Sequence, residues 1–182
     1  MNNDAYLKDV IRGFQMYKKL GDEAIAQVPT DVDFDRMLDP DSNSIAVIVQ
    51  HLAGNFRSRY RDFLTTDGEK PDRNRDGEFE MRGRATRDGV LRDWNDGWAV
   101  AMAALRALTP ADLDKTVTIR GEAFLVVEAL HRSVTHTAYH VGQIVYLARH
   151  FASPNWRSLS IPKGQSSEFF SKGDYKARGT AR

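Results

Sequence analysis

Apolar residues recur at steps of three and four along four long stretches of the chain, which is the spacing of helices that bury one face. In the first stretch, Leu7, Val10 and Phe14 follow this spacing, with Asp4 as the expected cap and Pro29 as the expected end. The stretches are residues 4–28, 44–64 (with Ser42 or Ser44 at its start), 86–108 and 125–151. Four helices of about 20 or more residues predict an all-α fold, a four-helix bundle.

The segments between these helices follow other patterns. Residues 116–119 alternate with a period of two and Gly121 follows them, which favours a small β-hairpin before the last helix. Residues 30–40 are predicted to form a loop, and residues 65–84 a long charged connection of the kind that is often functional. We expect a single helical domain over residues 1–171. The polar segment 172–182 is expected to be a disordered tail.

Composition excludes several classes of protein. The 26 basic and 25 acidic side chains leave a net charge of +1, which argues against a dedicated nucleic-acid binder. No apolar run approaches the roughly 20 residues of a membrane span, and the first residues do not resemble a secretory signal. The chain has no cysteine, so a disulfide, a thiolate ligand and a cysteine nucleophile are excluded. These features fit a reducing, cytoplasmic environment, with no membrane or nucleic-acid partner.

Three histidines are candidate metal ligands. His136 and His140 are four residues apart in a predicted helix, so they share one face and can hold one ion. His51 lies at the edge of the apolar stripe of another predicted helix. By contrast, His131 points about 140° away from His136, and His150 lies about 21 Å further along the axis. If the two helices pack together, three imidazoles converge and leave one coordination position open, as in catalytic metal sites.

Each of these signals has a plainer explanation when taken alone. Histidine pairs at this spacing arise by chance, and a histidine like His51 is commonly a hydrogen-bonded core residue. The combination is stronger, because three clustered imidazoles without a cation leave acceptor nitrogens unsatisfied and repel one another when protonated. Asn55, one turn after His51, and Gln143, seven residues after His136, are candidates for contacts that orient the ligands. Either could equally be an ordinary interior polar group.

Several segments together resemble a known group of proteins. They are HLAGNFRSR at 51–59, TDGEKP at 66–71, HTAYHVGQI at 136–144 and SIPKGQS at 160–166. With these segments the chain resembles the DinB/YfiT-like superfamily of metal-dependent helical-bundle proteins, and within it a family of unknown function. The resemblance extends from about residue 5 to residue 170. One departure is Asp72, which stands where an aromatic residue is expected after Lys70-Pro71.

The resemblance implies a four-helix bundle with a long crossover connection, and a homodimer. It also implies a divalent metal, zinc, nickel or iron-like, held by His51, His136 and His140. Characterised members of the superfamily include S-transferases that use glutathione, mycothiol or bacillithiol, and a maleylpyruvate isomerase. The leading hypothesis is therefore a thiol-dependent S-transferase that acts on a small-molecule substrate, with a low-molecular-weight thiol as cosubstrate.

Two alternatives stay open at the level of sequence. In a metal-dependent hydrolase the open position would hold water instead of a thiol. That chemistry needs a carboxylate nearby, and Glu78, Glu80 and Glu128 have no diagnostic spacing from the histidines. The other alternative is a non-enzymatic metal-binding protein of the stress response. Arg57 and Arg59 are candidates for binding a substrate carboxylate, although such arginines commonly pair with local aspartates.

Overall fold

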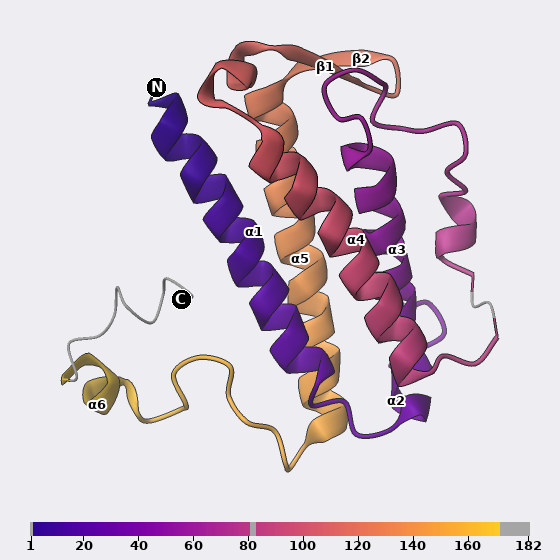
Figure 1. Cartoon of the computed structure of the whole chain (residues 1–182). Coiled ribbons are helices and arrows are strands. Elements are labelled where there is room, and N and C mark those ends of the chain that lie inside the picture. The colour runs from indigo at the N-terminus through magenta and orange to yellow at the C-terminus, as the bar shows by residue number, and fades with distance from the viewer. Residues whose placement is uncertain (1, 81–82, 172–182) are drawn as a thin grey trace.

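The computed structural model describes residues 2–80 and 83–171 (Figure 1). The tail predicted for residues 172–182 lies outside this range. The long helices are α1 (Asn3–Ile25), α3 (Ile45–Tyr60), α4 (Arg87–Ala107) and α5 (Val126–Ala152). The shorter elements are α2 (Asp31–Asp35), η1 (Asp76–Glu78), η2 (Pro110–Asp114), β1 (Thr116–Ile119), β2 (Glu122–Leu125) and α6 (Ser166–Ser171). The predicted all-α bundle with a small hairpin before the last long helix is confirmed.

Two predicted boundaries near the start of the chain are wrong. The side chain of Asn2, not Asp4, caps α1 by accepting a hydrogen bond from the backbone of Ala5. The helix ends at Ile25 because its last turn tightens: the N–H groups of residues 27 and 28 bond to carbonyls three positions back. The predicted loop 30–40 contains the short helix α2. The Asp33 carboxylate starts it by accepting bonds of 3.1 and 2.7 Å from the backbone and hydroxyl of Thr30.

The long helices pack around an aromatic core. In Figure 1, α1 lies beside α5, and α4 lies beside α3. Phe14, Phe56, Trp94 and Trp98 are almost completely buried between them and contact one another at ring centroid distances of 5.0–6.1 Å. The indole N–H of Trp94 donates to the Asp22 carboxylate at 2.6 Å, so its one polar atom is satisfied. None of the helices in the described ranges combines the length and apolar character needed to cross a bilayer.

The contact between α3 and α4 depends on Gly97. A Cβ atom at this position would lie 2.7 Å from the Cα of Ala53, on the facing helix. We expect Gly97→Ala to lower the free energy of unfolding by about 1–3 kcal/mol, because the added methyl group forces the helices apart. Gly13→Ala is the matched control: nothing lies within 4 Å of a Cβ there, so a gain of about 0.5–1 kcal/mol is expected. Urea denaturation measures both, and similar values for the two variants would contradict the close approach.

The hairpin anchors the long connection between α3 and α4. Its turn at Arg120 and Gly121 has positive φ angles of 55° and 77°, as a type I′ turn requires. The Asp67 carboxylate accepts hydrogen bonds from both of these backbone N–H groups, at 2.9 and 2.8 Å. Later in the connection, the Gln50 side chain on α3 donates to the backbone carbonyls of Gly77, Glu78 and Glu80, at 3.1, 2.8 and 3.1 Å. The connection therefore folds back along α3.

Candidate metal centre

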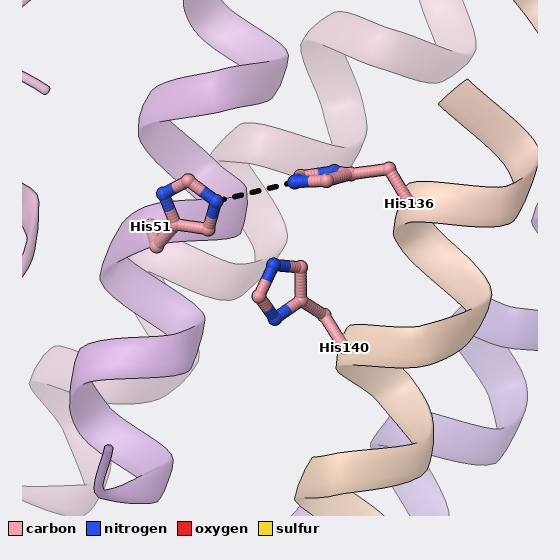
Figure 2. Close-up of side chains that lie close together, drawn as sticks. All are labelled: His51, His136 and His140. Atoms are coloured by element: carbon pink, nitrogen blue, oxygen red, sulfur yellow. Dashed lines mark hydrogen bonds between the residues drawn. The ribbon is translucent and has the colours of Figure 1, made fainter. Parts of the chain in front are cut away.

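The three predicted ligands converge between two helices. His51 extends from α3, and His136 and His140 extend from successive turns of α5 (Figure 2). The Nε2 atoms of His51 and His136 are 3.2 Å apart, and one nitrogen from each of the three rings lies within 4.8 Å of the others. Two nitrogens bound tetrahedrally to Zn²⁺ at 2.0–2.1 Å would be about 3.3 Å apart. The separation of the His51 and His136 nitrogens matches this spacing, and the nitrogen of His140 lies within 4.8 Å of both.

Neighbouring side chains fix which nitrogen of two rings faces the cluster. The Nδ1 atom of His51 is 2.9 Å from a carboxylate oxygen of Glu78, which can only accept, so this nitrogen carries the proton. The Nδ1 atom of His140 is 2.8 Å from the carbonyl oxygen of Gln143. Both Nε2 atoms are thereby left as acceptors directed at the cluster. Gln143 thus makes the contact to a candidate ligand that its spacing suggested.

One atom at the centre needs a partner. The Nε2 atom of His140 is buried and has no hydrogen-bond partner in the part of the chain that the structure describes. A buried acceptor without a donor costs about 1–3 kcal/mol. Because Gln143 engages the other nitrogen of this ring, a change of tautomer does not remove the cost. A divalent cation shared with His51 and His136 would satisfy this atom, so the residues present fit a metal ion.

Glu78 is a site residue that sequence reasoning missed. Its spacing from the histidines predicts no role at the site, yet it is buried and orients His51. Arg73 holds its two oxygens with two bonds of 2.8 Å. Burial alone would raise the pKa of Glu78, but the hydrogen bonds from Arg73 and His51 outweigh it and the pKa is lowered. One feature of the sequence is consistent with this contact. Gly54 lies one turn after His51, and a side chain at that position would collide with Glu78.

Burial keeps two of the candidate ligands neutral. Burial, together with the nearby charges of His140 and His51, lowers the pKa of His136 to about 3. Burial, together with the nearby charge of His51, lowers the pKa of His140 to about 4, although the hydrogen bond with Gln143 acts in the opposite direction. Imidazole must be neutral to bind a metal, so these two rings are in the binding form at neutral pH.

The lowered pKa values predict an acid-resistant centre. An unperturbed histidine becomes protonated as pH falls through about 6.5. At His136 and His140, with pKa values of about 3 and 4, protons compete with the metal only at lower pH, so we expect these two rings to hold the ion to about pH 5 and to release it between about pH 4 and 3. Equilibrium dialysis from pH 7 to 3, with circular dichroism to follow folding, measures this. Half-loss of metal near pH 6.5 in folded protein would contradict the buried environment.

A pocket of about 250 Å³ opens beside the cluster. His51 and His136 form part of its wall, as does Asn55, the other residue proposed to contact the ligands. The pocket is rich in arginine and, within the described ranges, no carboxylate lines it; its arginines are Arg59, Arg73, Arg75, Arg120 and Arg132. His131 lines a different pocket and His150 is exposed on α5, so both lie outside the site as the helix geometry predicted.

Comparison with known proteins places the chain in a family. The family model described as "Protein of unknown function (DUF1572)" matches residues 2–165, a range that includes all three histidines, the hairpin and the long helices. The chain belongs to this family. No curated protein matches the DUF1572 chain, and no solved structure matches it. The DUF1572 description assigns no function, so a functional assignment has to come from the chemistry of the site.

Proposed function

We propose that this protein is a metal-dependent enzyme that transfers the sulfur of a low-molecular-weight thiol to an electrophilic small molecule. The observation that carries the proposal is the unpartnered Nε2 atom of His140, at the meeting point of three imidazoles and next to a pocket. Within residues 2–80 and 83–171 the cluster offers three protein ligands, which is typical of catalytic rather than structural metal sites.

The residues at the centre would have two roles, metal binding and orientation of the ligands. His51, His136 and His140 would hold a divalent ion such as zinc, nickel or iron, while Glu78 and Gln143 keep two of the rings oriented. Such an ion supplies a position at which a bound thiol or water loses its proton near neutral pH. In the proposed reaction the thiol releases its proton to solvent. Its sulfur forms a bond to the acceptor, and the leaving group of the acceptor departs with the electron pair.

The hydrolase alternative has less support from the site. A water nucleophile needs a general base near the open position, and the carboxylates considered for this role are engaged or remote. Both oxygens of Glu78 are engaged: Oε1 accepts a hydrogen bond from Arg73, and Oε2 accepts from Arg73 and from His51. Glu128 accepts a bond from the backbone N–H of Leu125 at the start of α5, and Glu80 is exposed and does not line the pocket.

The resemblance to the DinB/YfiT-like superfamily supports several further proposals. They are membership of that superfamily, a homodimer and action on a small molecule. The balanced charge, the lack of cysteine and the lack of a long apolar run support the further proposals of a cytoplasmic location and of no nucleic-acid or membrane partner. Sedimentation velocity of the full chain tests the dimer. A monomer at tens of micromolar would overturn that part without affecting the metal site.

A thiol-transfer assay tests the proposed function. The zinc-loaded full chain would be incubated with glutathione, mycothiol or bacillithiol and a chlorinated fluorogenic acceptor. We expect one thiol to react at least about tenfold faster than without protein, and His140→Ala to lose this acceleration. No acceleration with any of these thiols would contradict the proposal. Thiol-independent cleavage of an ester acceptor would favour the hydrolase, and metal binding without either activity would favour a non-enzymatic protein.

A further inference from the structure

The arginines around the pocket are unequally engaged. Arg73 is committed to Glu78 and to Glu69, whose oxygen lies 3.2 Å from its Nη1 atom. Arg120 contacts the same Glu69 carboxylate at 3.1 Å. The carboxylates of Glu78 and Glu69 therefore neutralise part of the positive charge of these arginines, although neither carboxylate lines the pocket.

Arg59 is a pocket arginine that lacks a hydrogen-bond partner at one nitrogen of its guanidinium group, among the described residues. Its Nη1 atom is buried and has no hydrogen-bond partner in the described residues, and its side chain is held against Gly68. Burial lowers the pKa of Arg59 and so do the nearby charges of Arg73, Arg132 and Arg120, while Glu69 acts in the opposite direction. A guanidinium that has one buried nitrogen without a partner and lies among other cations is costly to maintain, and an incoming anion would relieve the repulsion.

Arg132 extends the same positive surface to the metal centre. It lies on α5 four residues before His136, so both side chains are on one face of the helix, and both line the pocket. Arg59 lies on α3 eight residues after His51, two turns along the helix. Each of the two helices thus contributes a metal-ligand candidate and an arginine to one cavity of about 250 Å³.

We propose that this pocket binds the oxyanion group, a carboxylate or a phosphate, of a small anionic ligand, with Arg59 and Arg132 as its contacts. A guanidinium group presents paired N–H donors that match such oxyanions in a bidentate manner. The volume is just below the usual range for drug-sized ligands, which indicates a metabolite of modest size. That this anion is the substrate rests on the proposed function. That the pocket binds an anion does not depend on it.

Titration calorimetry with the full chain tests the inference. The probes are succinate and inorganic phosphate, at ionic strength held constant with chloride, and they distinguish a carboxylate site from a phosphate site. We expect saturable binding of at least one probe, weakened about tenfold or more by Arg59→Gln and by Arg132→Gln. Arg57→Gln is the matched control, because Arg57 is on the same helix, pairs with Asp93 at 3.0 Å and does not line this pocket.

Several outcomes would overturn the inference. One is that neither probe shows saturable binding. Another is that Arg57→Gln weakens binding as much as Arg59→Gln does, which would indicate a general effect of charge. If Arg59→Gln does not fold, the exposed Arg132 decides the question. The variant His140→Ala, expected to lack the metal, should still bind the probe; loss of binding in folded protein would mean that the anion binds the ion instead. Because no turnover is measured, failure of the thiol assay would leave this result intact.

Discussion

Replacing His140 with alanine is expected to weaken metal binding severely while leaving the helices folded. The substitution removes the ligand whose Nε2 atom is buried and unpartnered in the described structure, and two imidazoles remain. Structural zinc sites with four ligands contribute about 10–16 kcal/mol, so loss of one ligand should weaken binding on the order of a hundredfold or more. Competition with a chromophoric zinc chelator measures the affinity, and circular dichroism reports the helicity.

The same helix offers the control. His150 is exposed near the end of α5, away from the cluster, so His150→Ala should bind metal as the unmodified chain does. His136→Ala should behave like His140→Ala. Full affinity in His140→Ala would show that the ion, if bound at all, is held elsewhere. An equal loss in His150→Ala would show that histidine content, rather than this geometry, determines binding.

Replacing Glu78 with glutamine is expected to weaken both the site and the fold. The carboxylate orients His51, and loss of such a contact behind a ligand typically lowers metal affinity by about 10–100-fold. It also pairs with Arg73, whose side chain is 4% exposed, and the substitution leaves that guanidinium with Glu69 alone. We expect the free energy of unfolding of metal-free protein to fall by about 3 kcal/mol, the lower end of the range for a broken buried pair.

Glu80→Gln separates these effects from a general loss of charge. Glu80 is exposed, two residues further along the same connection, and should tolerate the change with less than about 0.5 kcal/mol. The two readouts for Glu78→Gln are independent, because stability is measured without metal and affinity is measured on folded protein. An affinity equal to that of the unmodified chain would contradict the orienting role, and unchanged stability would contradict the buried pair.

Local periodicity was sufficient for the long helices and for two of the three candidate metal ligands. The apolar spacing predicted α3, α4 and α5 to within a few residues, because each helix buries one continuous face. The spacing of His136 and His140 within one helix fixes their common face regardless of the rest of the fold. His51 is buried on α3, and its approach to the pair depended on α3 packing beside α5, which periodicity does not specify.

The residues that sequence reasoning missed depend on contacts distant in sequence. Glu78 reaches His51 only because the connection from α3 to α4 folds back along α3. That path is set by Asp67 binding the hairpin turn and by Gln50 binding the backbone of η1. Arg59 was weighed with Arg57 as a possible anion binder, and the structure separates them: Arg57 pairs with Asp93, whereas Arg59 faces the pocket. Neither difference is encoded in local spacing.

The central claim is that three histidines bind one divalent ion, and elemental analysis of the full chain, purified without a histidine tag, tests it most directly. After dialysis against a small excess of Zn²⁺ and then against metal-free buffer, the account predicts about one ion per chain. Less than about a tenth of an ion per chain in folded protein, for zinc and for nickel and iron treated in the same way, would contradict it.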